Sequence, residues 1–311
     1  MNNKKFSIAI HGGAGTLLKG QMTAEKEQAY KSALEKALDA GYSILENGGS
    51  AVDAVEKAVT VLEDSPLFNA GKGAVFTAEG THEMDAAIME GKNLNAGAVS
   101  LITGIKNPVS LARDIMEKSD HVFLAGEGAM QFAKSNGFKI EDEAYFYDAL
   151  RYQQWQDIKG SDSFQLDHSV KKDSKFGTVG AVACDQEGNI AAATSTGGMT
   201  NKKWGRVGDS PMIGAGNYAN NKTCAVSCTG SGEYFIRGVV AYDVSCLMEF
   251  KSMSLKEASE EVIHRRILEL GGDGGLIAID AKGNIAMPFN TEGMYRAFKT
   301  SEGDKEISIY K

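Results

Sequence analysis

Residues 178–195 read TVGAVACDQEGNIAAATS, which is the pattern of two β-strands joined by a tight turn. Apolar and small residues flank an Asp and a Gly-Asn pair, and these turn residues are typical of a hairpin. A near copy, GGLIAIDAKGNIAMPFN, follows at 274–290. Both copies contain Ala-x-Asp-x-x-Gly-Asn-Ile-Ala, at 183–191 and 278–286. Two such similar hairpins predict one antiparallel β-layer rather than two domains.

Helices are predicted on both sides of these strands from apolar residues at helical spacing. Two begin after Thr23 and Ser50, whose hydroxyls can accept from the free N–H groups of a first helical turn. Strands separated by helical pairs predict the α+β class, with helices packed outside the sheet layers. Further helices are expected at about 108–118, 127–135, 144–156, 233–250 and 255–270, and further strands at 6–10, 67–77, 81–90, 96–102 and 121–125.

Charge and composition limit the partners. The 311 residues carry a net charge of -8 without a block of Lys or Arg, which argues against nucleic acid or an anionic membrane as a partner. The N-terminal apolar run, Phe6 to Ile10, is too short for the core of a signal peptide, and no stretch approaches the ~20 apolar residues of a membrane span. We therefore expect a cytoplasmic location. The four cysteines and five histidines lack zinc-site spacing, so no metallohydrolase is indicated.

Residues 157–177, DIKGSDSFQLDHSVKKDSKFG, have little apolar content and predict a flexible linker. Thr178 follows it directly. A threonine hydroxyl becomes a nucleophile when its own α-amino group takes its proton, and that requires a free N-terminus. Cleavage of the Gly177–Thr178 bond would create it. These residues alone, however, favour the simpler interpretation that Thr178 is a β-branched residue that begins a strand.

Two downstream loops offer groups that suit an amino-acid substrate. Arg206 and Asp209 lie in a glycine loop and could hold a carboxylate and an ammonium, or form a surface salt bridge instead. The turn from Thr229 to Gly232 could stabilise an oxyanion, or could be a glycine-rich helix entry or a phosphate loop. Neither common nucleotide-binding glycine motif is present there, which argues against a nucleotide-binding loop.

The ordered motifs of the chain resemble those of the plant-type asparaginases, also called isoaspartyl peptidases or β-aspartyl-peptidases, which are N-terminal nucleophile (Ntn) hydrolases. Only the linker and the termini fall outside the resemblance. The motifs that carry it are IAIHGGAGT, PLFNAGKGAVFT, HEMDAAIM, NAGAV, GTVGAVA, TSTGGMTNK, GRVGDSP, GAGNYANN, SCTGSGE, GGLIAID and PFNTEGMYRA.

The resemblance implies a single domain over 1–311 with a four-layer αββα sandwich fold. It implies self-cleavage into an α-subunit of residues 1–177 and a β-subunit of residues 178–311, and pairing into a dimer of αβ units. The implied substrates are a small molecule, L-asparagine, and short β-aspartyl peptides, which are hydrolysed through an acyl-enzyme to L-aspartate.

The resemblance also assigns roles to residues. Thr178 is the nucleophile, with Thr196 and Asn69 beside it and the oxyanion positions at Thr229 and Gly230. The substrate-binding set is Arg206, Val207, Gly208, Asp209, Thr229, Gly230, Ser231 and Gly232. No cofactor is required, but a sodium or potassium ion is implied at the backbone carbonyls of Leu62, Glu63, Ser65, Phe68, Ala70 and Lys72.

Two alternatives remain open at this point. One is a glycosylasparaginase, which cuts the link between an N-glycan and asparagine. The other is a non-cleaving protein that uses Arg206 and Asp209 only to hold an amino acid.

Overall fold

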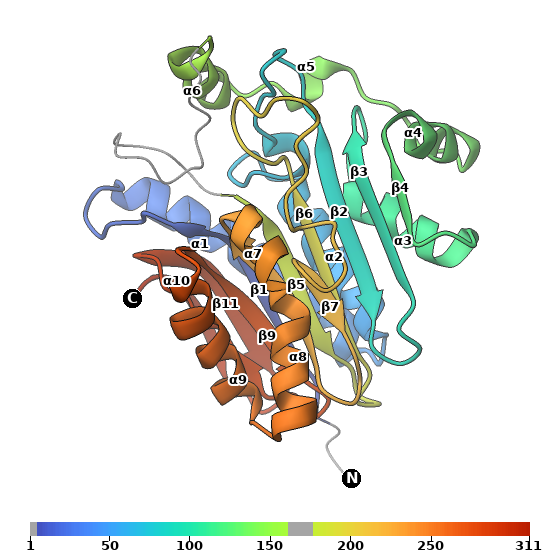
Figure 1. Cartoon of the computed structure of the whole chain (residues 1–311), viewed down its shortest axis with the longest axis vertical. Coiled ribbons are helices and arrows are strands. Elements are labelled where there is room, and N and C mark those ends of the chain that lie inside the picture. The colour runs from blue at the N-terminus through green and yellow to red at the C-terminus, as the bar shows by residue number, and fades with distance from the viewer. Residues whose placement is uncertain (1–4, 161–176) are drawn as a thin grey trace.

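The strands form two sheets that pack face to face in residues 5–160 and 177–311, the part of the chain described by this computed structural model (Figure 1). The larger sheet has eight strands and the smaller has four. The larger contains β1 (Ser7–Gly15), β2 (Met84–Glu90), β3 (Ala96–Ile102), β4 (Phe123–Ala125), β5 (Val179–Cys184), β6 (Ile190–Thr196), β11 (Gly293–Thr300) and β12 (Lys305–Tyr310), in the spatial order β12-β11-β1-β5-β6-β2-β3-β4. The smaller contains β7 (Asn217–Ala219), β8 (Cys224–Gly230), β9 (Gly274–Asp280) and β10 (Ile285–Ala286), in the order β10-β9-β8-β7.

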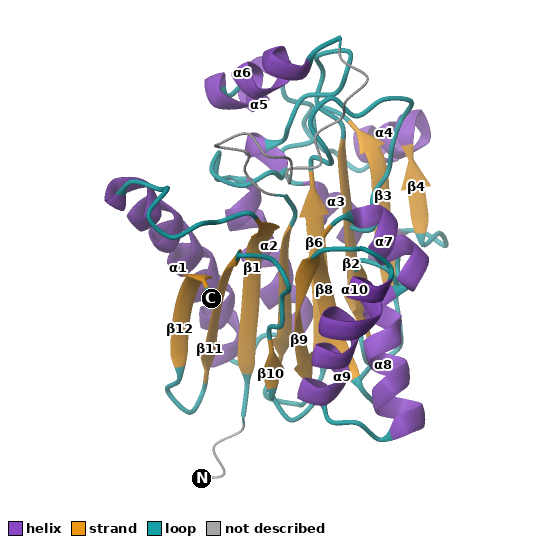
Figure 2. Ribbon diagram, turned by 60° about the vertical axis from the view of Figure 1, so that its left-hand side comes forward, coloured by secondary structure: helices purple, strands orange, loops and turns teal. Residues whose placement is uncertain are grey.

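Helices cover the outer face of each sheet, so the layers run α, β, β, α (Figure 2). The helices on the larger sheet are α1 (Ala24–Glu46), α2 (Ala51–Glu63) and α3 (Pro108–Lys118), and those on the smaller sheet are α8 (Val240–Lys251) and α9 (Leu255–Glu261). The expected four-layer sandwich of the α+β class is confirmed. The remaining helices are η1 (Gly71–Gly73), α4 (Gly126–Ser135), α5 (Glu143–Phe146), α6 (Ala149–Ile158), α7 (Gly232–Gly238), η2 (Val262–Arg266) and α10 (Ile267–Glu269).

Both predicted N-caps are present. The Thr23 hydroxyl accepts from the Lys26 amide at 3.3 Å, and the Ser50 hydroxyl accepts from the Asp53 amide at 3.1 Å. Each bond satisfies a donor that the first turn of a helix otherwise leaves free.

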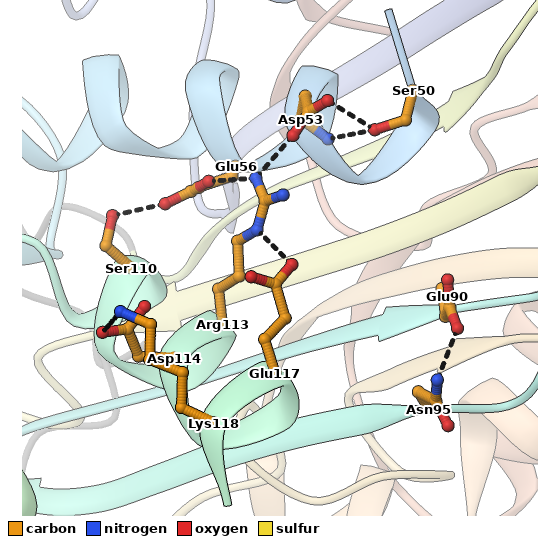
Figure 3. A network of polar contacts seen from close by, with 10 residues as sticks. All are labelled: Ser50, Asp53, Glu56, Glu90, Asn95, Ser110, Arg113, Asp114, Glu117 and Lys118. Carbon is orange, nitrogen blue, oxygen red and sulfur yellow. Dashed lines mark hydrogen bonds and ion pairs between the residues drawn. The ribbon is translucent and has the colours of Figure 1, made fainter.

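An ion-pair network joins α2 to α3 on the outside of the larger sheet (Figure 3). The Arg113 guanidinium on α3 lies 2.7 Å from Asp53 and 2.6 Å from Glu56, both on α2, and 2.8 Å from Glu117 on its own helix. The Glu56 carboxylate also accepts from the Ser110 hydroxyl at 2.6 Å. This network fixes the two helices against each other over the strands that carry the site.

The two similar hairpins lie in different sheets, so the expectation of a single β-layer is wrong. The β5–β6 hairpin belongs to the larger sheet and β9–β10 to the smaller. Asp185 and Asp280 close the two turns alike, because Oδ1 of each accepts from two backbone N–H groups at 2.9–3.0 Å. The shared motif therefore determines the turn, whereas the distant strands on either side determine the sheet.

Residues 67–77 form no strand, contrary to the pattern. The chain doubles back there: Gly71 has φ 51°, and a Cβ on Gly73 would lie 2.0 Å from the Phe68 carbonyl oxygen. By contrast, β1 continues through its glycines to Gly15, with irregular pairing between His11 and Ala14.

Three predicted helices differ in their continuity. The expected helix at 144–156 is divided into α5 and α6, because Tyr147 is extended and the Asp148 carboxylate caps α6 by accepting from the Arg151 amide at 3.0 Å. The expected helix at 233–250 is divided into α7 and α8 by Val239, which has φ 48°. The helix at 255–270 runs on as α9, the π-turn η2 and α10.

Most of the predicted linker at 157–177 lies outside the described residues, and α6 extends to Ile158 at its start. None of the helices in the described ranges combines the length and apolarity needed to cross a lipid bilayer.

Candidate active site

The alternation of side chains along the strands places the predicted nucleophile between the two sheets. On β5, Val179, Ala181 and Ala183 pack toward the helices on the larger sheet, whereas Val182 and Cys184 pack against the smaller sheet. Because strand side chains alternate, Thr178 belongs to the second group. Val179 pairs with Ser195, so extending the β5–β6 register by one residue sets Thr178 opposite Thr196.

The three predicted threonines are buried at this end of the sandwich, with 7% of Thr178, 3% of Thr196 and 1% of Thr229 exposed. The Thr178 hydroxyl lies 3.3 Å from the Ser210 hydroxyl, and the Thr196 hydroxyl accepts from the Gly198 amide at 3.0 Å. The Thr229 hydroxyl has no hydrogen-bond partner among residues 5–160 and 177–311. A Cβ on Gly177 would lie 3.6 Å from that hydroxyl, so Thr229 lies beside the predicted cleavage site.

His11 contacts the residue that would be the nucleophile. Its Nδ1 lies 3.1 Å from the Thr178 carbonyl oxygen, and its Nε2 lies 2.9 Å from the Ser227 hydroxyl on the smaller sheet. The ring is fully buried, and this burial lowers the pKa of His11 to about 3. The imidazole is therefore neutral at physiological pH.

Arg206 and Asp209 both lie beside Gly232 at the start of α7. A Cβ on Gly232 would lie 2.9 Å from Arg206 Nη2 and 2.9 Å from Asp209 Oδ1. The guanidinium also forms a two-point ion pair with Glu233, at 2.9 and 3.0 Å. A positive and a negative group thus border one small space, which suits the carboxylate and ammonium of an α-amino acid.

Asp209 is buried without full compensation. Burial raises its pKa to about 7, against the opposing effect of the positive charge of Arg206. Its Oδ2 has no hydrogen-bond partner in the described part of the chain. A buried, unpaired carboxylate oxygen is costly, and its presence favours a ligand-binding role.

The turn after β8 is tightly packed. Gly230 has φ 152°, and a Cβ there would lie 2.4 Å from the Asp273 carbonyl oxygen. The Ser231 amide donates to that same carbonyl at 3.0 Å, and the Ser231 hydroxyl donates to the Asp273 carboxylate. Ser231 therefore holds the turn against the β9 end of the smaller sheet. In the 205–211 loop, Val207 is half-buried, and a Cβ on the buried Gly208 would lie 2.9 Å from Arg206 Nη1.

Asn69 lies beside the segment that follows Thr196, with its amide engaged on both sides. The amide nitrogen donates to the Gly198 carbonyl at 2.7 Å, and the amide oxygen accepts from the Val75 amide at 3.1 Å. This geometry makes Asn69 a support for the loop next to Thr196.

The segment predicted to bind an alkali ion is a tight turn in which backbone carbonyl oxygens lie close to Gly71 and Gly73. A Cβ on Gly71 would lie 2.5 Å from the Glu63 carbonyl oxygen, and one on Gly73 would lie 2.8 Å from that of Pro66. Backbone carbonyl oxygens are hard ligands of the kind that such cations take. The Lys72 ammonium lies over the Tyr145 ring, 5.4 Å from its centroid. The predicted ligands are Leu62, Glu63, Ser65, Phe68, Ala70 and Lys72.

Four residues of the site were missed by the sequence analysis: His11, Ser210, Ser227 and Glu233. A signal was available for two of them, since Ser227 stands two positions before Thr229 and a strand places such residues on one face. His11 shares the inter-sheet face of β1 with Ala9 by the same rule. Ser210 and Glu233 lie in loop and helix positions whose contacts depend on the tertiary fold.

Known proteins match this chain along nearly all of its length. A family model described as asparaginase matches residues 4–309. The chain belongs to the asparaginase family. It is 52% identical over 310 residues to an isoaspartyl peptidase of Escherichia coli K12, which covers 99% of this chain and 97% of that protein. The resemblance inferred from the motifs is confirmed.

More distant members of the asparaginase family agree. An isoaspartyl peptidase/L-asparaginase of Xenopus laevis is 43% identical over 304 residues, which covers 97% of this chain and 94% of that protein. A plant-type L-asparaginase of Pyrococcus abyssi is 44% identical over 308 residues, which covers 94% of this chain and 95% of that protein. As a member of the asparaginase family, the chain is an enzyme, a hydrolase with the layered fold of the Ntn hydrolases.

Proposed function

We propose that this chain is an autoprocessing threonine amidohydrolase that converts β-aspartyl peptides and L-asparagine to L-aspartate. The observation that carries the proposal is a pair of buried oxygens, Thr229 Oγ1 and Asp209 Oδ2, that lack partners in the described residues. One lies by the cleavage site and the other by Arg206. A substrate that brings an oxyanion to the first and an ammonium to the second would satisfy both. The names of the relatives support the same activity.

In the proposed reaction the Thr178 hydroxyl attacks the side-chain carbonyl carbon of the substrate. Its proton passes to the free α-amino group of Thr178, whose ordinary pKa of about 7.7 to 8.0 leaves part of it neutral. Thr229 and Gly230 stabilise the oxyanion, and ammonia or an amino acid leaves with the proton. Water then hydrolyses the acyl-enzyme ester, which frees L-aspartate and restores the hydroxyl. Thr196 orients the α-amine, and Asn69 holds the loop that follows.

The same hydroxyl would first cut its own chain. Attack of Thr178 Oγ1 on the Gly177 carbonyl carbon shifts the acyl group from nitrogen to oxygen, and water hydrolyses the resulting ester. The products would be residues 1–177 and 178–311, with Thr178 at a new N-terminus. The hydroxyl of Thr229 beside Gly177 supports this use of the site for both steps.

The substrate headgroup would bind between Arg206 and Asp209, with Val207, Gly208, Ser231 and Gly232 shaping the loops. The turn from Leu62 to Lys72 would hold a sodium or potassium ion at its backbone carbonyls. The ion would stabilise this turn, which contains Asn69, the donor to the Gly198 carbonyl. We propose a cytoplasmic enzyme assembled as a dimer of αβ units.

The test of processing is the size of the purified protein. Wild type should give two fragments on denaturing electrophoresis, with sequencing of the smaller one starting at Thr178. Thr178→Ala should stay intact and inactive, whereas Thr178→Ser should cleave. An intact wild-type band after long incubation would instead favour the non-cleaving amino-acid binder.

The test of substrate is a comparison of β-aspartyl-leucine, L-asparagine and a glycosylated asparagine. We expect turnover of the first two. Turnover of the glycosylated compound alone would replace the proposal with a glycosylasparaginase.

A further inference from the structure

A row of buried polar side chains crosses between the two sheets and ends at the backbone of Thr178. The row consists of four fully buried residues that alternate between the larger and the smaller sheet: His11, Ser227, Thr194 and Asn217. The Ser227 hydroxyl lies 2.9 Å from His11 Nε2 and 2.7 Å from the Thr194 hydroxyl, and the Asn217 amide nitrogen lies 3.0 Å from that hydroxyl.

The chemistry of the groups determines the direction of both hydrogen bonds of His11. A carbonyl oxygen only accepts, so His11 Nδ1 must carry the hydrogen and donate to the Thr178 carbonyl. The neutral ring then accepts at Nε2, which makes Ser227 the donor there. The single proton of Ser227 goes to His11, so Thr194 donates to Ser227 at 2.7 Å, which is nearer than its other acceptor, the Gly216 carbonyl at 3.3 Å. Thr194 in turn accepts from the Asn217 amide.

The sequence makes room for this row at one position. His11 pairs with Gly180 across β1 and β5. A Cβ on Gly180 would lie 2.0 Å from the Ser227 hydroxyl and 2.4 Å from His11 Nε2. Only glycine leaves the imidazole free to reach the second sheet.

We infer that His11 is a positioning residue, which holds the Thr178 carbonyl through an Nδ1–H donor so that the α-amine and hydroxyl of Thr178 keep the geometry that catalysis needs. The inference rests on the proposed function of Thr178. The bond fixes the peptide plane between Thr178 and Val179, because that carbonyl belongs to it. The α-amine and side chain of Thr178 are attached to the same Cα, so their orientation follows.

A matched pair of amide variants tests the inference. In His11→Asn the side-chain amide nitrogen falls near the place of Nδ1 and retains a donor for Thr178. In His11→Gln it falls near Nε2 and retains only the contact with Ser227. We expect His11→Gln to lose roughly 10- to 100-fold in kcat while KM changes less than about 2-fold, and His11→Asn to stay within about 3-fold of wild type in both.

A second pair serves if the histidine variants fold poorly. Ser227→Ala removes the hydroxyl that holds His11 Nε2 at 2.9 Å. Ser245→Ala removes an equally buried hydroxyl that bonds Thr223 at 2.7 Å on the far side of the smaller sheet. We expect Ser227→Ala to lower kcat several-fold and Ser245→Ala to leave it unchanged. Equal kcat for the two would overturn the inference.

Two measurements on wild type, cleavage and turnover, separate this inference from the proposed function. All kcat values are expressed per mole of chain that begins at Thr178, as counted by mass spectrometry. If wild type neither cleaves nor turns over β-aspartyl-leucine, the proposed function fails. If wild type is active and the two histidine variants lose kcat equally, or change KM instead, His11 has no positioning role.

Discussion

Arg206 and Glu233 form a two-point ion pair, with Nε 2.9 Å from Oε1 and Nη2 3.0 Å from Oε2. A planar guanidinium held by two parallel bonds keeps a defined orientation. Its second terminal nitrogen, Nη1, lies next to Gly208 in the same loop. Glu233 therefore sets the orientation of the Arg206 guanidinium beside the proposed headgroup site.

Glu233→Gln should raise KM about 3- to 10-fold with little change in kcat, because a neutral amide holds Arg206 less firmly before substrate binds. Steady-state kinetics on β-aspartyl-leucine measure this. Glu35→Gln, which removes an ion pair with Lys305 at 2.7 Å, is the control and should leave KM unchanged. A lower KM in Glu233→Gln would mean that Glu233 competes with the substrate carboxylate.

Gly232→Ala should raise KM by about 10-fold or more, because its methyl group enters the space between Arg206 and Asp209. Gly128→Ala on α4 is the control, since a Cβ there meets nothing within 4 Å. That change should leave kinetics unchanged and raise stability by roughly 0.5–1 kcal/mol. Unaltered kinetics in Gly232→Ala would exclude this space as the headgroup site.

The value of kcat/KM should fall as the pH drops below about 7, because the raised pKa of Asp209 lets the buried carboxyl take up a proton. The protonated form carries no charge to pair with an ammonium, so binding is lost on the acid side. Asp209→Asn should be weakly active, and the only acid limb left in its profile should be that of the Thr178 α-amine, whose ordinary pKa is about 7.7 to 8.0. A wild-type profile that stays flat from pH 8 to 5 would rule out Asp209 as the ammonium partner.

Thr229→Val should lower kcat by about 10²- to 10³-fold, as expected for the loss of one oxyanion donor. Its thermal stability should be unchanged or higher, because the hydroxyl has no partner among the described residues and valine fits the same space. Thr223→Val is the opposite case. That variant leaves the buried Ser245 hydroxyl unpaired and should lose stability while keeping kcat.

Trp204→Asn should stabilise the protein by about 1 kcal/mol, measured as a rise in the melting temperature. Trp204 is 95% exposed with φ 56°, in a turn closed by the Arg206 amide donating to the Lys203 carbonyl at 3.1 Å. Asparagine tolerates that backbone conformation better and gives up no buried surface. Phe250→Asn, at a 69% exposed helical position, should bring no gain.

Local features of the fold followed from the sequence because their causes are local. Thr23 and Ser50 cap their helices through the amide three residues ahead, and that relationship is visible in the sequence. The hairpin turns at Asp185 and Asp280 are local in the same sense. The motifs, in their order, also identified the family.

The rest depended on contacts between distant segments. Val239 is a β-branched residue in a helical pattern, yet it adopts a left-handed conformation that separates α7 from α8. The partners of Arg206 and His11 lie 27 and 216 residues away along the chain, at Glu233 and Ser227. Such distances exceed what spacing and propensity can reveal, so the candidate residues were predicted but their supporting contacts were not.

The order of strands in the larger sheet determines what a break before Thr178 would leave behind. Strand β1 precedes that break, yet it is flanked by β11 and β5, which follow it, and β6 is bonded to β2 in the same crossed manner. Strands of the two polypeptides would therefore alternate within one sheet. Neither polypeptide could leave without breaking the hydrogen bonds between these strands, so the two should unfold together in one transition. A half that is produced separately should not replace its counterpart in the cleaved protein.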